Sequence, residues 1–566
     1  MSGDRHADRH ADRRARAALL LALPLLALLL WSVVYPNASV VAGSFEHGLQ
    51  HWREFAASPA DREALVATLW ISVASVVAAT LVGLPLALAL ARSDFPGRRL
   101  LAAVATLPAA LPPLVGVIAF LFLYGESGFI TRVVQRALGT RDAPWRFSGA
   151  WAIVFVHAYT MYVYVYLFVA AALERLDASL EEAAAGLGAS RWRLLRRVTL
   201  PLLMPALAGA MLLVFMSSLG SFSAPYVFGG GLRVLATQIV ASRLNDAEGL
   251  AYVETTVLAL SAVLAVLLLR RLERGRTVAS LGKGARPRTS VRGGRRVAAG
   301  LLAAVAVLAL VLPHVVVVVQ AFAKEGAWTT QLVPPSYTLD NVRRLGTDPE
   351  LWKPVRNSVL MALVATGGNV LVCLLGAYLV VLRRFRGRRF LELLLTLPWA
   401  IPPTAIAVGL ASTFDHNDPL TLRVLLVGTW WILPLAYFVR GVPLVASAVE
   451  GSLRQMDPSL EDAARGLGAS WRLTAWRVVL PAARPGLAAG ATLALITGIG
   501  EFVASQILYT HANRPISSEI LSQLRDQAFG TAAAYSALLI VLVLLVTLLA
   551  RRLGEGRQGA ETTLNA

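Results

Sequence analysis

Cysteine and charged residues are both scarce in this chain. Of its 566 residues only 15% are charged and 56% are hydrophobic, so it cannot build the polar surfaces of a soluble protein of this length. The single cysteine, Cys373, lies within an apolar run, which rules out an intrachain disulfide and a cysteine-based metal site. The loops show no Ser/His/Asp catalytic arrangement, no His/Cys cluster and no G-x-x-x-x-G-K-S/T phosphate-binding motif. We therefore expect no catalytic residues, no metal, no cofactor and no ATP hydrolysis by the chain itself.

Long apolar runs fill most of the sequence. They are roughly 18 to 28 residues long, the length that a helix needs to cross the bilayer. The first run follows a basic segment and resembles a secretory signal, but it continues to about Val34 with no small-residue cleavage site directly after it, so we expect an uncleaved first span. The fold class predicted is an all-α polytopic membrane protein with twelve transmembrane helices. The spans are centred on residues 17–35, 64–91, 100–123, 149–172, 202–222, 249–269, 298–322, 356–382, 390–412, 423–447, 484–506 and 532–550.

The net charge of +19 is distributed along the short loops. Arginine clusters between apolar runs are typical of topology signals, and this placement argues against a nucleic-acid partner. The segment from Arg270 to Arg296 alone carries ten Lys and Arg residues. Alternate loops are basic, so the positive-inside rule predicts that both termini and this central segment are cytoplasmic.

The same pattern occurs twice along the chain. LEEAAAGLGASRWRLLRRVTLP at 180–201 and LEDAARGLGASWRLTAWRVVLP at 460–481 are identical at 13 of 22 positions, at a constant offset of 280. Earlier in each half, GRRLLAAVATLPAALPP (97–113) matches GRRFLELLLTLPWAIPP (387–403) at an offset of 290. Each half has six predicted spans, so both enter the membrane from the same side and form two parallel six-helix repeats. The predicted division is a basic N-terminus 1–16, a first half 17–269, a basic linker 270–297, a second half 298–552 and a tail 553–566.

The repeated stretch predicts two short helices with a bend between them. In the first copy, Ser179 and Glu182 have the spacing of a capping box, and alanines extend the helix until Gly186 interrupts it. Ser190 can cap a second short helix that carries the arginines and ends near Pro201. The second copy has the same plan, with Ser459, Asp462, Gly466, Ser470 and Pro481 at the matching positions.

Two interpretations of this element are open. An amphipathic anchor in the lipid headgroups is the simpler one. However, one face of the first helix carries only small residues, and the loop is more alike between the halves than most of the spans are. Both observations favour close contact with another protein surface.

The motif E-E/D-A-A-x-G-L-G-A-S, about twenty residues before a Leu-Pro and between the fourth and fifth spans of a six-span unit, resembles the EAA loop of inner-membrane permeases of binding-protein-dependent ABC importers. In that family the loop forms a coupling helix that docks on a cytoplasmic ATPase subunit. The resemblance implies a bacterial inner-membrane protein whose partners are an ATP-binding subunit, an ATPase dimer in the assembly, and an extracytoplasmic solute-binding protein. It departs from the pattern at Arg465, opposite Ala185, which we expect on an outward face. The coupling residues implied are Glu181, Ala184, Gly186 and Gly188, with Glu461, Ala464, Gly466 and Gly468.

Ionisable and polar residues within the spans are candidates for the translocation path, because they are costly in a bilayer. Glu501 and Arg440 lie in the second half, where a structural ion pair is an equally good interpretation. His157 begins the tyrosine-rich stretch HAYTMYVYVY of the fourth span, for which packing or an interfacial aromatic belt is the simpler explanation, and Ser221 is the counterpart of Glu501 in the first half. The paired prolines at 112–113 and 402–403 should kink the third and ninth spans.

The main rival is a secondary transporter of the major-facilitator kind, which also has twelve spans in two parallel halves. It does not account for the repeated loop after the fourth span. Among importers, permeases with both halves in one chain most resemble the ferric-iron group, with thiamine and aminophosphonate permeases as alternatives. We therefore predict a permease subunit that translocates ferric iron and depends on a partner for ATP hydrolysis.

Overall fold

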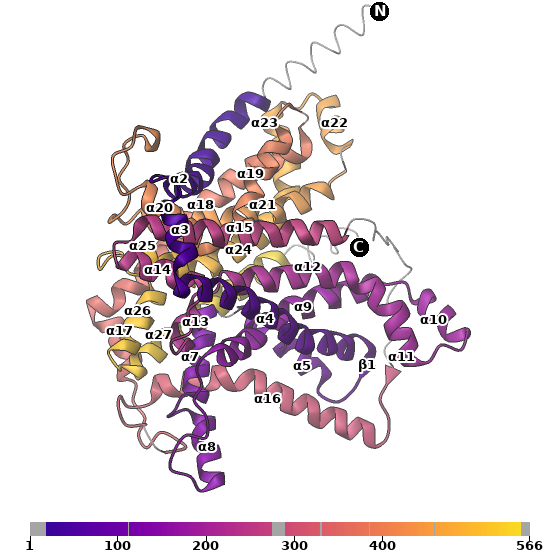
Figure 1. Cartoon of the computed structure of the whole chain (residues 1–566). Helices are drawn as coiled ribbons and strands as arrows, with labels where there is room; N and C mark the ends of the chain where they lie inside the picture. The colour runs from indigo at the N-terminus through magenta and orange to yellow at the C-terminus, as the bar shows by residue number, and fades with distance from the viewer. Residues whose placement is uncertain are drawn as a thin grey trace, which may run out of the picture. The chain divides into compact units, whose positions relative to one another are not determined.

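The computed structural model is almost entirely helical (Figure 1). It describes residues 18–110, 112–273, 289–328, 331–383, 385–457 and 459–555. The predicted basic N-terminus 1–16, most of the linker 270–297 and nearly all of the tail 553–566 lie outside these residues. Among the residues described, the only strands are β1 (Ser93–Asp94) and β2 (Thr289–Ser290), which pair in parallel. The all-α prediction is confirmed.

Eleven helices in the described part of the chain are long and apolar enough to cross a membrane, and a bent helix pair raises the number to twelve. The pair consists of α19 (Arg388–Ala400) and α20 (Pro403–Thr413), which meet at an angle of 106°. Ile401 precedes Pro402 and is extended, as steric conflict with a following proline requires, and neither Pro402 nor Pro403 can donate a helix hydrogen bond. The predicted kink in the ninth span is therefore confirmed.

The third span is broken more thoroughly than predicted. In place of one helix over 100–123, the chain forms α5 (Arg98–Val104), α6 (Leu107–Ala110) and α7 (Pro113–Tyr124). Pro112 adopts an extended conformation before α7, so the kink at the paired prolines is present here as well. The stretch of membrane-spanning length begins only at Pro113 and continues through α8 (Phe129–Leu138).

The chain divides into two compact units that differ from the sequence halves. Unit 1 consists of the described residues of Met1–His51, Arg343–Gln527 and Leu538–Ala566, and unit 2 of those of Trp52–Val342 and Ala528–Ala537. The first helix of each half thus belongs to the unit built mainly from the other half. The sequence repeat and the compact unit are different divisions of the chain.

Unit 1 packs the helical residues 18–43 against helices from the second half of the sequence. Leu25 and Leu29 are buried in one core with Leu395 and Phe414. The hydroxyl of Tyr35 donates a hydrogen bond to the Asp418 carboxylate. The elements of unit 1 are η1 (Leu30–Val34), α2 (Tyr35–Gly43), α18 (Pro349–Leu382), α19, α20, η3 (Pro419–Thr421), α21 (Ile432–Arg454), α22 (Ser459–Gly466), α23 (Trp471–Thr474), η4 (Ala475–Val479), α24 (Leu480–Ile499), α25 (Val503–Leu508) and α26 (Ile516–Arg525), with part of α27 (Phe529–Glu555).

Unit 2 makes the reciprocal arrangement with α16 (Gly294–Phe322), which runs beside α5 and α7 in Figure 1. Ala303 of α16 is buried in the same core as Leu101, and Tyr159 donates to the carbonyl of Leu310 at 2.8 Å. The remaining elements are α4 (Pro59–Arg92), α9 (Ala150–Arg175), α10 (Ala178–Gly186), α11 (Arg191–Leu194), η2 (Leu195–Thr199), α12 (Leu200–Leu219), α13 (Ser223–Phe228), α14 (Leu235–Leu244), α15 (Glu248–Glu273) and the start of α27. The division between the units crosses α3 (Gln50–Ala57) and α17 (Asp340–Thr347).

Candidate functional site

The first copy of the repeated loop forms α10 and α11 in unit 2. Asp177 precedes α10 and its carboxylate accepts a hydrogen bond from the backbone N–H of Ser179 at 2.9 Å. The predicted cap at Ser179 is therefore wrong, because an aspartate two residues earlier is at least as good a cap and starts the helix sooner. The helix ends at Gly186, and Gly188 has a left-handed φ of +79°. Only a glycine adopts this conformation without strain, so Gly188 sets the bend.

The second copy repeats this geometry in unit 1. The N–H of Ser459 donates to the Asp457 carboxylate at 2.9 Å, which lowers the pKa of this carboxyl group. Gly468 has a φ of +82°. The shared bend confirms the predicted helix–bend–helix element in both halves.

The second short helix is capped as predicted but does not end as predicted. Ser190 accepts from the N–H of Arg193, and Ser470 accepts from the N–H of Leu473, both at 3.4 Å. Instead of stopping near Pro201, the chain continues through the π-helical turn η2 into α12, where Leu200 donates to the carbonyl of Leu195. A wider turn just before a proline accommodates its missing N–H. The bend at Gly188 is thus joined directly to the fifth span.

Glu181 lies on the inner face of α10 and is only 2% exposed. The Thr199 hydroxyl donates to its carboxylate at 2.6 Å, and the Arg92 guanidinium forms an ion pair with the same oxygen. Arg92 also donates to Thr199 at 3.2 Å. A buried carboxylate is tolerated only when it is paired in this way. Glu181 therefore ties α10 to the end of α4 and to η2.

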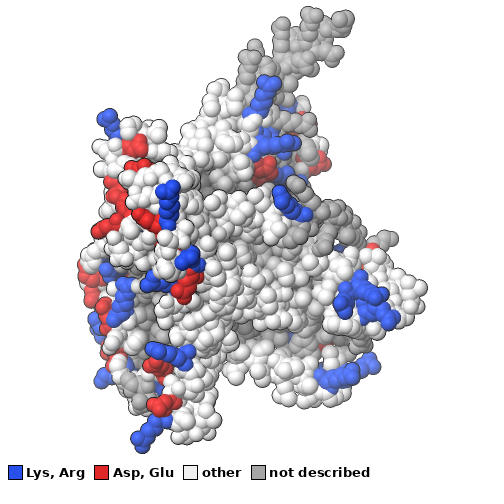
Figure 2. All heavy atoms as spheres, in the orientation of Figure 1, with Lys and Arg blue, Asp and Glu red and all other residues white. Residues whose placement is uncertain are grey.

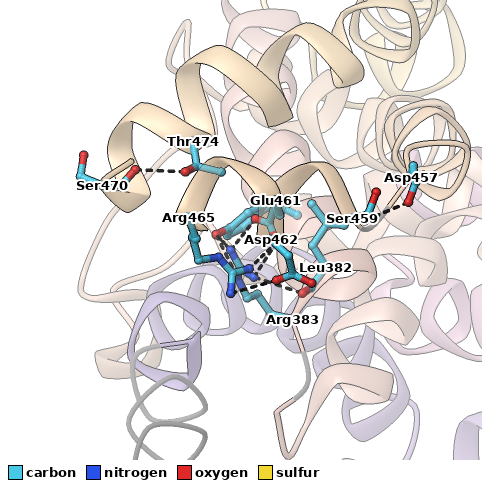
Figure 3. Close-up of polar contacts among 10 residues, drawn as sticks. Leu382, Arg383, Asp457, Ser459, Glu461, Asp462, Arg465, Ser470 and Thr474 are labelled. Carbon is cyan, nitrogen blue, oxygen red and sulfur yellow. Dashed lines mark hydrogen bonds and ion pairs between the residues drawn. The ribbon is translucent and has the colours of Figure 1, made fainter. Parts of the chain in front are cut away.

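Glu461 makes the equivalent link in unit 1, with a richer set of partners (Figure 3). Arg383 donates to both carboxylate oxygens, at 2.7 and 3.0 Å, and Arg465 donates to one of them at 3.1 Å. The Nε of Arg383 also donates to the Tyr378 hydroxyl at 2.9 Å. Burial lowers the pKa of Arg383, but the hydrogen bonds to Glu461 and Tyr378 outweigh it and raise the pKa above its ordinary value. Arg465, expected to face outward, instead turns back onto Glu461.

The two arginines do not occupy matching positions in the repeats. Arg92 is the last residue of α4, whereas Arg383 follows the last residue of α18. At the offset of 290, Arg383 corresponds to Ser93, and at the offset of 280, Thr199 corresponds to Val479. Sequence comparison between the halves therefore missed both arginines. The available signal was an arginine at the C-terminal end of the second span in each half.

Each loop exposes a leucine at its bend and an open glycine beside it. Leu187 and Leu467, at the tips of the two bends, are each 90% exposed. An added Cβ at Gly186 or Gly466 would meet no atom within 4 Å. Ala184 and Ala464 are half-buried. A basic patch in Figure 2 covers the α10–α11 segment, where the exposed arginines are Arg193, Arg196 and Arg197.

The candidate path residues of unit 2 form one hydroxyl-rich cluster. Both ring nitrogens of His157 are hydrogen-bonded, Nδ1 to Ser75 at 2.9 Å and to Ser218 at 3.1 Å, and Nε2 to Ser221 at 2.9 Å. His157 is 2% exposed. The cluster joins α4 and α9 to the end of α12 and to the segment that follows it.

The candidate path residues of unit 1 form an ion pair at the corresponding place. Arg440 pairs with Glu501, and the carboxylate of Glu501 also accepts the N–H groups of Ala504 at 3.1 Å and Ser505 at 2.8 Å, which caps α25. At the offset of 280, Tyr437 corresponds to His157, and its hydroxyl lies 2.7 Å from that of Ser505. The ion pair between Arg440 and Glu501, one of the two interpretations of the sequence, is therefore present. The two units thus have different polar groups at equivalent positions of the repeat.

Removing one partner of the Glu461 link should destabilise unit 1. Arg383→Met leaves the buried carboxylate of Glu461 with Arg465 as its remaining partner, and we expect a loss of about 3 kcal/mol. The temperature of unfolding of the purified protein measures this. The double variant Arg383→Met/Glu461→Met removes both charges and should recover part of the loss. If the single and double variants unfold alike, the pair does not hold the loop.

The two glycines of the first bend should respond differently to substitution. Gly188→Ala forces an alanine into a left-handed conformation, which costs about 1 kcal/mol. Gly186→Ala places its methyl group in open space at a helical residue, so we expect no loss of stability. Thermal unfolding of the two matched variants compares them. Equal destabilisation would contradict the assignment of the bend to Gly188.

Comparison with known proteins identifies the family. The family model described as binding-protein-dependent transport system inner membrane component matches residues 79–278 and 370–557 of this chain. A probable ABC transporter permease, y4fN of Sinorhizobium fredii, is 30% identical over 90% of this chain and 91% of the relative. The ferric transport system permease FbpB of Actinobacillus pleuropneumoniae is 28% identical over 78% of this chain and 64% of the relative. The molybdenum transport system permease ModB of Mycobacterium tuberculosis is 36% identical over 34% of this chain and 72% of the relative.

These matches confirm the resemblance carried by the repeated loop, since the family model covers that loop in both halves. The chain belongs to the family of inner membrane components of binding-protein-dependent transport systems.

Proposed function

We propose that this permease carries ferric iron across the membrane. As a binding-protein-dependent ABC permease, the chain is the translocation component, and a separate ATP-binding subunit and a periplasmic solute-binding protein are its partners. The ferric transport permease aligns with 78% of this chain, so the match extends across both halves, whereas the molybdenum permease aligns with 34%. The extent of the iron-permease match is the observation that supports ferric iron as the substrate.

We infer that α10 and α22 are the elements that contact the ATP-binding subunit. Leu187 and Leu467 are nearly fully exposed at the tips of their bends, and an apolar side chain in that position gains free energy only when a partner covers it. The inward glutamates Glu181 and Glu461 hold each helix to its own unit through Arg92 and Arg383. On this proposal the outer face binds the partner and the inner face transmits its movement.

The two polar clusters support a proposal about the path. Ser221 and Glu501 directly follow the fifth span of their halves at matching positions of the repeat. Each is bonded to a residue of the fourth span, Ser221 to His157 and Glu501 to Arg440. Both ring nitrogens of His157 and both carboxylate oxygens of Glu501 are hydrogen-bonded within their own unit, and Arg440 pairs with Glu501 through Nη1. We infer that they shape the wall of the path by fixing α13 and α25 rather than by binding the solute.

Replacing the exposed leucine should weaken partner binding without unfolding the permease. Leu187→Ser is expected to lower the affinity for the ATP-binding subunit by about tenfold or more, because a buried leucine contributes about 1.5–3 kcal/mol. Co-purification and titration of the two subunits measure the effect, and Leu467→Ser tests the second loop. The matched control is Leu244→Ser at the end of α14, where the leucine is 80% exposed. If the control weakens the complex as much as Leu187→Ser, α10 is not the contact.

Bulk at the open glycines should uncouple transport. Gly186→Trp and Gly466→Trp meet no atom of the chain near the Cβ, so the permease should fold and reach the membrane while uptake falls. Uptake and ATP hydrolysis by the reconstituted transporter are the measurements. Uptake that continues without the ATP-binding subunit and follows a proton gradient would contradict the proposed function.

Substrate identity can be tested with radiolabelled ions. Proteoliposomes that contain the permease, its ATP-binding subunit and its binding protein should accumulate ferric iron when ATP is supplied inside. Molybdate is the comparison substrate, because a molybdenum permease is among the relatives. ATP-dependent accumulation of molybdate in place of iron would show that the substrate is wrong while the importer class is right.

We also propose that both termini and the basic linker are cytoplasmic, as the distribution of arginine in the loops supports. A green fluorescent protein fused after Ala566 should fluoresce, and an alkaline phosphatase fused there should be inactive. The reverse result would invert the topology and would place α10 and α22 away from the ATP-binding subunit.

A further inference from the structure

A cavity of about 430 Å³ lies beside α10 in unit 2. This volume is typical of sites for small molecules. The walls are the end of α4, the start of α5, the end of α9 and the first turn of α10. The polar and small residues that matter are Arg92, Arg98, Ala102, Ala170, Glu174 and Glu181.

The same positions in unit 1 carry long charged side chains. At the two repeat offsets, Ala102 corresponds to Glu392, Ala170 to Glu450 and Glu174 to Arg454. Arg454 donates to Glu392 at 3.1 Å and to Glu450 at 3.2 Å, so these three side chains form an ion-pair network. At these positions unit 2 has the methyl groups of Ala102 and Ala170, and the carboxylate of Glu174 in place of an arginine.

The two arginines that line the cavity, Arg92 and Arg98, differ in their hydrogen-bond partners. Arg92 is committed to Glu181 and Thr199. Arg98 donates through Nη1 to the carbonyl of Leu90 at 3.3 Å, but its buried Nε has no hydrogen-bond partner and lies 3.5 Å from the exposed carboxylate of Asp94.

The counterpart of Arg98 in unit 1 is Arg388. Unit 1 also carries the Glu450 carboxylate, and unit 2 has Ala170 at that position. Glu174 is exposed and has no hydrogen bond or ion pair among the described residues. The cavity thus presents one cation and one anion that the chain does not pair with each other.

We propose that this cavity binds a zwitterion of the phosphoethanolamine type, with its phosphate on Arg98 and its ammonium group on Glu174. A guanidinium fork matches phosphate geometry, and a primary ammonium group donates readily to a carboxylate. Ala87, Leu90 and Leu173 supply an apolar wall. The ligand would occupy the space that the side chains of Glu392, Glu450 and Arg454 fill in unit 1, and it would lie beside Glu181. Of the two helices α10 and α22, only α10 would then have a ligand next to its buried glutamate.

Two sources supply this chemistry, the headgroup of phosphatidylethanolamine and soluble phosphoethanolamine. Native mass spectrometry of the purified full-length permease with each of them, and with phosphatidylglycerol, distinguishes the sources. We expect phosphatidylethanolamine or phosphoethanolamine to bind with one site per chain, and phosphatidylglycerol, which has no ammonium group, to bind about tenfold more weakly. Equal binding of the two lipids, with no binding of phosphoethanolamine, overturns the proposal.

Variants test the location. The triple variant Ala102→Glu/Ala170→Glu/Glu174→Arg reproduces the unit 1 network and should abolish the site. The control Ala103→Glu/Ala171→Glu adds the same carboxylates at exposed neighbouring positions and should retain binding. Glu174→Gln, which disturbs no packing, should weaken binding of the ammonium-bearing ligand about tenfold. Unchanged binding in the triple variant or in Glu174→Gln overturns the proposal. Neither ATP, iron nor the partner subunits are present, so this result is independent of the proposed function.

Discussion

The buried ion pair between a glutamate of the first loop helix, α10 or α22, and an arginine at the end of the second span of each half is the interaction on which the loop geometry depends. An ionised carboxylate with 2% or 6% exposure is unfavourable unless it is paired and hydrogen-bonded. The pairing fixes the inner face of α10 to α4 and of α22 to the end of α18. The outer face, with Leu187 and Leu467, is then presented in a defined orientation. On our proposal, a movement of the partner reaches the spans through this pair and through the continuous helix that follows the bend.

The repeats conserve this arrangement while the residues that provide it have changed. Unit 2 uses Arg92 and Thr199, and unit 1 uses Arg383, Tyr378 and Arg465. The polar position after the fifth span has changed in the same way, from a histidine with three serines to an arginine–glutamate pair. Next to α10 the exchange of charged for small residues is accompanied by a cavity. The two units thus hold equivalent helices with different side chains, and α10 and α22 differ in their surroundings.

The local sequence predicts much of the secondary structure, but it predicts few of the side chains that pair with one another in the fold. The paired prolines predicted the breaks at 112–113 and 402–403, because backbone donors and steric limits are properties of the residues themselves. The cap was misplaced because Asp177 and Ser179 are both good caps and only the path of the chain decides between them. Arg92 and Arg383 were missed among many loop arginines, since which one turns inward depends on tertiary packing. The sequence also did not predict that the first helix of each half packs in the unit built mainly from the other half, because this too depends on tertiary packing.

The ratio of solute transported to ATP hydrolysed tests the central claim most directly. It should be measured in the reconstituted transporter for the wild type and for Arg92→Met and Arg383→Met, with assembly of the ATP-binding subunit confirmed for each. The account predicts that the subunit still binds, because Leu187 and Leu467 remain exposed, while the transport obtained per ATP falls severalfold in both variants. An unchanged ratio in a correctly assembled complex would contradict it, because movement would then reach the spans without the buried pair.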